Sequence, residues 1–393
     1  MFGNLKELPK PIGEYIVGIT HMDLIDQSRR QVFPFEEEDA QRKVPLTIFY
    51  PADSSEGKKP APYAFPEALE KLSKLTYGFW SKRMANLKTH IYEDIPVSQK
   101  KDQFPIIFFN QGFISYQMQS TVLCSDLASL GYIVISVGHP YESSAVKFTD
   151  GSIIEVHNDI IEIQKNAFDK EYIKQFTKLL REKNTYSDAK AMEAAEFLFN
   201  DIHFNDSVKR WADDTIFVAD QLEGINSGKV ESIFINKLQL DRGFGITGHS
   251  LGGAISAQVC YVDERFFCGI NIDGGTWGDY LYKDIKTPFL VIGQNFIRNV
   301  LRTTFIYNSQ DSYLIAVDKT GHWGFCDVLF ASRQAILMGN KVGLREKYEF
   351  REIITKFHSA FFAKYLLGVG GVKLNELIYP GIEYQEKLSL QIT

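Results

Sequence analysis

The sequence predicts an α/β fold with a mostly parallel central sheet flanked by helices. Residues 104–109 and 132–137 are apolar runs with the composition of strands buried on both faces. Between them, residues 116–130 carry apolar side chains at helical spacing, and Gly131 ends the segment. A strand, a helix and a second strand in this order are typical of a parallel sheet, because the helix provides the crossover between the strands.

The preceding and following residues predict more of the same sheet and two insertions. Residues 14–26 and 44–50 are rich in Val, Ile, Thr and Tyr, as strands are. Residues 60–95 mix proline, aromatic and charged residues without a clear period, so we expect a partly helical insertion there. Residues 155–215 are charged and helix-forming, which predicts a helical cap over the sheet. We expect a single domain over residues 1–393 that contains both insertions.

The C-terminal part of the chain predicts three further strands and a long helix. The strand-like runs end at Ile272, Ile292 and Val317. Residues 351–367 repeat large apolar side chains along one helical stripe. We expect this stripe to pack against the sheet, and contact with a lipid surface is the alternative.

A short glycine-rich motif lies at residues 245–253, which read Gly-Ile-Thr-Gly-His-Ser-Leu-Gly-Gly and include a G-x-S-x-G pentapeptide. An apolar run precedes the motif and a helix-compatible stretch of small residues follows it. This setting predicts a nucleophile elbow, a tight turn that lifts a serine side chain clear of the backbone. Ser250 is therefore the candidate nucleophile, and His249 is expected to pack beside the turn. An ordinary glycine-rich turn is the alternative.

An acid and a base follow at the ends of later strands. Asp273 comes directly after one predicted strand, and His322 follows shortly after another. Because the carboxyl ends of parallel strands meet at one edge of a sheet, we expect these side chains to lie near Ser250. The chain order Ser, Asp, His is the order found in the α/β-hydrolases.

These three residue types together can perform nucleophilic catalysis. His322 would accept the proton of the Ser250 hydroxyl and later return it to the leaving group. Asp273 would orient the imidazole and stabilise its charged form. Asp318 and Asp311 are alternative acids because they also lie before His322, and Asp273 would then be a plain turn residue.

Two main-chain amides are candidates for an oxyanion hole. The N–H of Leu251 begins the helix after the turn, and the N–H of Phe113 lies in the loop after the first buried strand. Three further residues are candidates for lining the substrate pocket. His139 follows a predicted strand, and its alternative role is that of the base. Trp277 and Trp323 lie close in sequence to the acid and the base, and the alternative for both is plain packing.

Composition and charge argue against several other classes of function. The formal net charge is −6 and no basic block is present, so nucleic-acid binding is not expected. No apolar run reaches the roughly 18 residues of a membrane span, whereas peripheral contact with lipid is compatible with the sequence. The polar N-terminus does not resemble a signal peptide. We therefore expect a cytoplasmic protein, or a secreted one if a leader has been removed.

Neither a metal nor another cofactor is expected. No cluster of His, Cys, Asp or Glu has the spacing of a metal site. The four cysteines lack paired spacing, so we expect free thiols at Cys124, Cys260, Cys268 and Cys326. The expected partner is a small-molecule ester or phospholipid substrate, and the sequence does not indicate an oligomeric state.

Taken together, these motifs resemble the platelet-activating-factor acetylhydrolase family, which comprises the plasma-type, lipoprotein-associated phospholipases A2 and their bacterial relatives. The resemblance is carried by Asp273 and by residues 44–52, 110–113, 125–139, 248–253 and 322–327. It implies an α/β-hydrolase fold and calcium-independent hydrolysis of short or oxidised sn-2 acyl chains, with the triad and oxyanion residues as placed above.

Two dipeptides depart from the pattern of that family. Residues 111–112 are Gln-Gly where the family commonly has His-Gly, and residues 140–141 are Pro-Tyr where it often has Arg-Asp. Both departures fall at the expected mouth of the pocket. They bear on the phospholipid substrate and leave the type of reaction unchanged.

The sequence as a whole predicts a serine esterase that works through an acyl-enzyme. The expected substrate is a short-chain carboxylic ester, including the sn-2 acetyl or short acyl group of a phospholipid. A broad carboxylesterase, a dienelactone-hydrolase-like enzyme and an amidase with the same machinery are alternatives. An alternative of another class is a catalytically inactive lipid-binding protein on the same fold.

Overall fold

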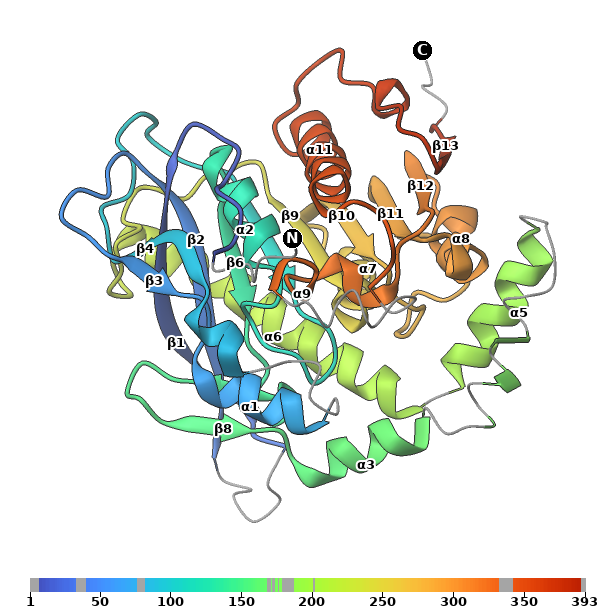
Figure 1. Cartoon of the computed structure of the whole chain (residues 1–393), viewed down its shortest axis with the longest axis horizontal. Coiled ribbons are helices and arrows are strands. Elements are labelled where there is room, and N and C mark those ends of the chain that lie inside the picture. Colours follow the sequence, from blue (N-terminus) through green and yellow to red (C-terminus); the bar gives the residue numbers. More distant parts are fainter. Residues whose placement is uncertain are drawn as a thin grey trace, which may run out of the picture.

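In the computed structural model, the described residues form a central sheet of eleven strands (Figure 1). Its strand order is β13-β12-β11-β10-β9-β5-β6-β2-β1-β4-β3. The structure describes residues 7–32, 40–75, 82–167, 187–200, 202–331 and 342–389, together with a few residues between 171 and 178.

The middle of the sheet is parallel and almost entirely buried. Its neighbouring strands are β12 (Ser312–Val317), β11 (Phe289–Gln294), β10 (Phe266–Ile272), β9 (Phe244–His249), β5 (Ile106–Asn110) and β6 (Ile133–Val137). Apolar side chains point to both faces of these strands, so no polar face is left for solvent. The predicted α/β class with a mostly parallel sheet is confirmed.

Mostly antiparallel pairs complete both edges of the sheet, with β4 parallel to β1 as the exception. On one side β2 (Gln41–Ala52) pairs with β6 and with the long β1 (Ile16–Arg30). Beyond β1 lie β4 (Lys88–Glu93) and β3 (Pro60–Pro62). On the other side β13 (Ile382–Lys387) pairs with β12. A separate hairpin is formed by β7 (Ala145–Lys147) and β8 (Ile153–Glu155).

The region over residues 60–95 differs from the expected partly helical insertion. It contains α1 (Pro66–Leu75) and the 3-10 turn η2 (Lys82–Asn86), but β3 and β4 also extend the sheet from it. β3 is three residues long and carries two prolines, so it has no propensity signal of its own. The strands form because β1 offers an edge, which a local sequence pattern does not reveal.

Helices cover the two faces of the sheet with separate cores. One face carries α2 (Thr121–Ser129) and α11 (Lys347–Tyr365), and the other carries α6 (Ile202–Ser227), α7 (Leu251–Val262) and α8 (Arg298–Tyr307). Successive side chains of β5 point to opposite faces of the sheet and so contribute to both cores. Ile107 and Phe109 face the first set of helices, while Ile106 and Phe108 face the second.

The apolar stripe of the C-terminal helix packs inside the protein. Phe357 and Phe361 of α11 are fully buried against the sheet. The alternative in which this stripe meets a lipid surface is therefore wrong. Short elements connect the remaining parts of the fold: η3 (Asn295–Ile297), η4 (His322–Phe325), α9 (Val328–Ala331) and η6 (Leu374–Glu376).

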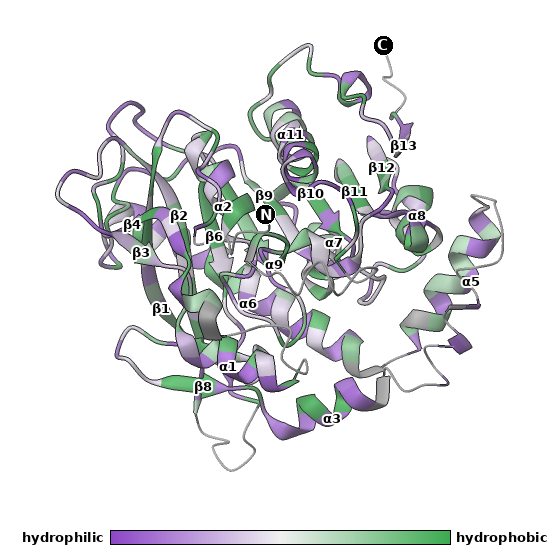
Figure 2. Ribbon diagram, in the orientation of Figure 1, coloured by the Kyte–Doolittle hydropathy of each residue, from purple (hydrophilic) through white to green (hydrophobic). Residues whose placement is uncertain are grey.

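The segment expected to form a cap is helical where it is described. It contains α3 (Asn158–Ala167), α5 (Asp188–Phe199) and the start of α6, and α5 packs on α8. Figure 1 shows α3 and α5 at the periphery, and Figure 2 shows hydrophobic and hydrophilic residues side by side on both. Most of residues 168–186 lie outside the described residues. That these helices act as a cap stays a prediction.

No helix in the described ranges is long and apolar enough to cross a membrane. The four cysteines are all buried and free.

A buried histidine makes the stability of this fold sensitive to acid. His358 of α11 is fully buried, with Nδ1 2.7 Å from the Ile354 carbonyl oxygen and Nε2 3.2 Å from Thr247 Oγ1 on β9. Burial lowers the pKa of His358 to about 4. As the pH falls below about 6.5, the His358 imidazole binds a proton in the unfolded chain but stays neutral in the folded chain. The free energy of unfolding therefore decreases.

We predict that His358→Gln removes part of this acid sensitivity. Between pH 7 and pH 4, the wild-type protein should lose about 3 kcal/mol more stability than the variant, because only the wild type has this titrating group. Urea unfolding at both pH values measures the difference. Equal losses in the two proteins would contradict the assignment, whatever the absolute stability of the variant at pH 7.

Candidate active site

The turn between β9 and α7 places Ser250 at the carboxyl edge of the sheet. Its backbone has φ 58° and ψ −120°, a conformation that residues other than glycine rarely adopt. The Ser250 N–H donates a hydrogen bond of 2.8 Å to the carbonyl of Ile272, so the neighbouring strand β10 holds the turn in place. This strained strand–turn–helix geometry is that of a nucleophile elbow.

The glycines around the serine are required by backbone packing. A Cβ on Gly248 would lie 2.2 Å from the carbonyl oxygen of Gly252. A Cβ on Gly252 would lie 2.0 Å from the carbonyl oxygen of Asn110, at the end of β5. Since carbonyl groups of the main chain cannot rotate away as side chains do, only glycine lets the turn approach β5 so closely.

Ser250, His322 and Asp273 form one hydrogen-bonded chain in the structure. His322 Nε2 lies 3.0 Å from Ser250 Oγ, and His322 Nδ1 lies 2.7 Å from Asp273 Oδ2. The three residues come from the ends of β9 and β10 and from η4, which follows β12. With its Nδ1–H donated to the carboxylate, the imidazole can accept the serine proton at Nε2.

Asp273 is held by a residue that the sequence analysis did not single out. The carboxylate is buried, and Gln294 at the end of β11 contacts both of its oxygens. The main-chain N–H of Gln294 donates to Oδ1 at 2.8 Å, and its side-chain Nε2 donates to Oδ2 at 2.9 Å. These bonds fix the carboxylate towards the His322 ring. An amide residue after a strand carries no distinctive sequence signal, because its role depends on register with β10.

The alternative acids lie elsewhere. Asp318 accepts a hydrogen bond of 2.6 Å from Arg345, and Asp311 accepts one of 2.6 Å from the hydroxyl of Tyr365. Of the three candidate carboxylates, only Asp273 contacts His322 among the described residues.

The loop after β5 passes directly beside the serine. A Cβ on Gly112 would lie 3.3 Å from Ser250 Cβ. The Gly112 N–H donates to Gln119 Oε1, which leaves the next amide, that of Phe113, as the candidate donor from this loop. Within the described residues, neither this amide nor that of Leu251 has a hydrogen-bond acceptor. Whether both point at one oxyanion stays a prediction.

Trp277 belongs to an aromatic cluster next to this loop. Its ring centroid lies 5.1 Å from that of Phe204 on α6, which in turn lies 5.0 Å from that of Phe113. Trp323 is partly buried and packs against the core on the opposite face of the sheet, to which α2 and α11 contribute. The two tryptophans therefore have different surroundings, and a role in a substrate pocket stays a prediction for both.

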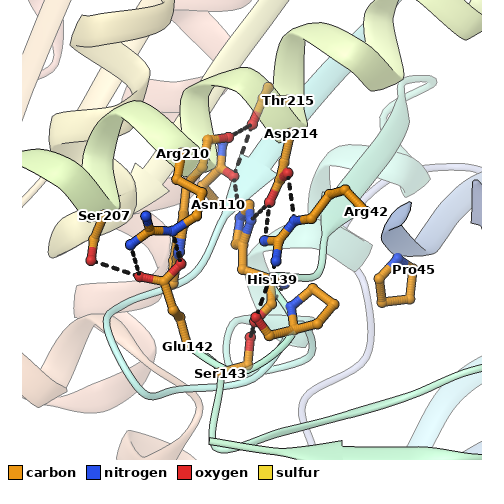
Figure 3. Close-up of polar contacts among 12 residues, drawn as sticks. Arg42, Pro45, Asn110, His139, Glu142, Ser143, Ser207, Arg210, Asp214 and Thr215 are labelled. Carbon is orange, nitrogen blue, oxygen red and sulfur yellow. Dashed lines mark hydrogen bonds and ion pairs between the residues drawn. The ribbon is translucent and has the colours of Figure 1, made fainter. Parts of the chain in front are cut away.

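The prediction that His139 lines the mouth of the pocket is wrong. Its side chain is fully buried beneath α6, where its ring stacks on Trp211 with 3.9 Å between centroids. Its Nδ1 lies 2.9 Å from Asp214 Oδ2 and its Nε2 lies 3.0 Å from Asn110 Oδ1 (Figure 3). The residue does follow β6 at the expected edge of the sheet, but α6 covers that part of the edge.

A buried polar network surrounds His139 and ties α6 to the sheet (Figure 3). Arg42 at the start of β2 pairs with Asp214 of α6 at 2.6 Å. Glu142, after β6, accepts hydrogen bonds from Arg210, Trp211 and Ser207 of α6. Burial alone would raise the pKa of Asp214, but Arg42 and His139 outweigh it and hold that pKa far below its ordinary value. Burial lowers the pKa of His139.

The part of the chain that the structure describes contains no set of side chains arranged as metal ligands. No group of three or more His, Cys, Asp or Glu side chains there could hold a metal ion.

Comparison with known proteins identifies the family. The sequence profile of the family described as "Platelet-activating factor acetylhydrolase, isoform II" matches residues 2–370. The chain belongs to this family. The resemblance inferred from the motifs is confirmed, and this member of the acetylhydrolase family is a carboxylic ester hydrolase.

Relatives of this acetylhydrolase family member are also named as acetylhydrolases or esterases. The platelet-activating factor acetylhydrolase of Cavia porcellus is 27% identical over 377 residues, which cover 91% of this chain and 78% of the relative. A probable 1-alkyl-2-acetylglycerophosphocholine esterase of Arthroderma benhamiae is 23% identical over 285 residues, covering 69% of this chain and 60% of the relative.

A solved structure shows the same architecture. The ferulic acid esterase from Streptomyces cinnamoneus superposes with a TM-score of 0.71 and 21% identity, covering 97% of this chain and 99% of the other. At this identity the likeness bears on the fold alone. It agrees with the α/β-hydrolase fold expected from the sequence.

We predict that Gly252→Ala destabilises the protein by about 2–3 kcal/mol, because the new methyl group collides with the main chain of β5 and forces a backbone shift. Gly370→Ala is the matched control, since a Cβ there meets no atom within 4 Å. Urea unfolding of both variants measures the difference. A Gly252→Ala protein as stable as Gly370→Ala would contradict the close packing described for the elbow.

Proposed function

We propose that this protein is a serine esterase that cleaves short-chain carboxylic esters, including the sn-2 acetyl or short acyl group of a phospholipid, through an acyl-enzyme. The observation that carries the proposal is the hydrogen-bonded chain from Ser250 through His322 to Asp273 at a strained elbow. This arrangement provides a nucleophile, a general base and an orienting acid in one place.

In the acylation step, Ser250 Oγ attacks the carbonyl carbon of the ester while His322 Nε2 takes the hydroxyl proton. The carbonyl π electrons move to oxygen and form a tetrahedral oxyanion. Asp273 stabilises the imidazolium, and the amides of Leu251 and Phe113 donate to the oxyanion. When the carbonyl re-forms, the bond to the alcohol oxygen breaks, and His322 gives its proton to that oxygen.

Deacylation repeats these events with water. His322 removes a proton from a water molecule as its oxygen attacks the acyl carbon, and the same amides stabilise the second oxyanion. Collapse of this intermediate breaks the bond to Ser250 Oγ, which recovers its proton from His322. The products are a carboxylic acid and the regenerated enzyme.

Two observations support a short acyl group on the substrate. The relative from Cavia porcellus is named an acetylhydrolase, and the one from Arthroderma benhamiae is named a probable 1-alkyl-2-acetylglycerophosphocholine esterase. In this chain, the proposed oxyanion residue Phe113 packs against Phe204, which packs against Trp277. From these large rings next to the loop we infer that the acyl side of the site is narrow.

We predict that Ser250→Ala abolishes hydrolysis of p-nitrophenyl acetate, with kcat falling at least about 10³-fold, because no other group supplies the nucleophile. The variant should remain folded by circular dichroism. Ser227→Ala, which changes an exposed serine at the end of α6, is the control and should keep wild-type turnover. A fluorophosphonate probe should label the wild type on the peptide that contains Ser250. Retained turnover in Ser250→Ala would refute the proposal.

We further predict a preference for short acyl chains. In a panel of acetyl, butyryl and octanoyl esters of p-nitrophenol, kcat/KM should fall about tenfold or more from acetyl to octanoyl, since the aromatic cluster restricts the acyl side of the site. A phosphatidylcholine with an sn-2 acetyl group should also be hydrolysed. A flat profile without phospholipid cleavage would instead indicate a broad carboxylesterase.

A further inference from the structure

Three hydrogen bonds, two of them buried and the third partly buried, join the oxyanion loop to the main chain of His322. The Gly112 N–H lies 3.1 Å from Gln119 Oε1, and Gln119 Nε2 lies 3.1 Å from His249 Nδ1. His249 Nε2 lies 2.9 Å from the carbonyl oxygen of His322. Gln119 is 1% exposed and His249 is 3% exposed, so water cannot readily replace either partner. We call this chain of bonds the Gln119–His249 bridge.

The direction of every bond in the bridge follows from its first donor. A main-chain amide can only donate, so Gln119 must accept with its side-chain oxygen and present its NH2 group to His249. His249 Nδ1 must then be an acceptor, and the remaining proton of a neutral ring lies on Nε2. That proton is donated to the His322 carbonyl, which can only accept. Each group therefore has one role and no alternative orientation.

We propose that Gln119 and His249 are positioning residues of the esterase, which hold the Phe113 loop and the catalytic histidine at a fixed distance from each other. The proposal rests on the proposed function of the site. Neither residue touches the reacting atoms. The bridge connects the two sides of the serine, because the loop supplies an oxyanion donor and His322 moves the proton. A shift of either side by about 1 Å would reduce the rate.

The surroundings of His249 keep its ring in the form that the bridge requires. Burial and the neighbouring His322 lower the pKa of His249 well below its ordinary value. The centroids of the two rings are 4.7 Å apart. His322 becomes positively charged during each catalytic cycle, so a second imidazolium at this distance would oppose proton transfer. A neutral His249 avoids this repulsion.

Cys326 is a further polar neighbour of the His249 ring. Its Sγ lies 3.4 Å from Nδ1, and burial raises the pKa of the thiol far above its ordinary value, so it stays protonated. The thiol contacts the ring without reaching the Gly112 loop. Cys326→Ala is therefore a matched control, because it removes a polar contact of His249 and leaves the bridge intact.

Gln119→Leu and Gln119→Glu test the bridge in different ways. Leucine has nearly the same size but makes neither hydrogen bond. Glutamate still accepts from the Gly112 amide, yet it can bond His249 Nδ1 only while a proton is shared between the carboxylate and the ring. When that proton leaves at higher pH, two lone pairs face each other and the bridge breaks. The titratable groups beside this pair are His322, Cys326 and Asp327. The main-chain N–H of Asp327 donates to the carbonyl oxygen of Gln119, and burial raises the pKa of its carboxyl well above the ordinary value.

Hydrolysis of p-nitrophenyl acetate from pH 5.5 to 8.5 is the kinetic measurement. Gln119→Leu should lower kcat about 10- to 100-fold at every pH, with KM changed less than about threefold, because the groups that stabilise the transition state are misplaced while binding is kept. Gln119→Glu should stay within about tenfold of wild type at pH 6 and lose activity as the pH rises. Cys326→Ala should remain within about threefold of wild type throughout.

A second measurement does not depend on turnover. In protein labelled with ¹⁵N-histidine, the spectrum of His249 should show a protonated Nε2 and an unprotonated Nδ1 from pH 5.5 to 8.5, and Gln119→Leu should change it. A protonated Nδ1 in the wild type would overturn the bridge even in an inactive enzyme. Two kinetic results would also overturn it, provided that the wild type is active. One is a Gln119→Leu variant with the kcat of the wild type, and the other is a Gln119→Glu variant with the pH profile of the wild type. A wild-type protein that does not react with the fluorophosphonate probe would instead refute only the proposed function.

Discussion

The site depends on how closely the main chain of the elbow approaches the end of β5. The carbonyl oxygen of Asn110 lies where a Cβ on Gly252 would be, and Gly248 is limited in the same way by Gly252. This packing turns the Ser250 backbone into a strained conformation and brings the Gly112 loop against the serine. Ser250 and the loop that carries the candidate oxyanion donor therefore take their positions from one backbone contact.

Hydrogen bonds from the surrounding elements support this contact on each side. Gln294 at the end of β11 holds the Asp273 carboxylate, and His249 holds the carbonyl of His322. On the outer side, the buried network of His139, Asp214 and Glu142 attaches α6 to the ends of β5 and β6. The buried Asp273, His249, His139, Asp214 and Glu142 side chains all have hydrogen-bond partners within the protein, which offset their loss of contact with water.

Strong local patterns in the sequence predicted most of the architecture. Elements with a weak local pattern were not predicted, and each has a physical reason. The apolar runs of β5, β6, β9 and β10 are visible in the sequence because both faces of these strands are buried. β3 and β13 were missed, since an edge strand with exposed residues has no continuous apolar signal. His139 was placed at the right edge of the sheet but with the wrong exposure, because α6 covers it.

The sequence by itself determined the family, the mostly parallel sheet and the residues that gather at its carboxyl edge. It could do so because the G-x-S-x-G turn and the strand-end Asp and His are local features with a common direction along parallel strands. Only the tertiary structure decided which carboxylate reaches His322 and which polar residues hold it. Asp273, Gln294 and Gln119 meet their partners across 49, 21 and 130 residues of chain, and those contacts depend on strand register and helix packing. No spacing in the linear sequence encodes them.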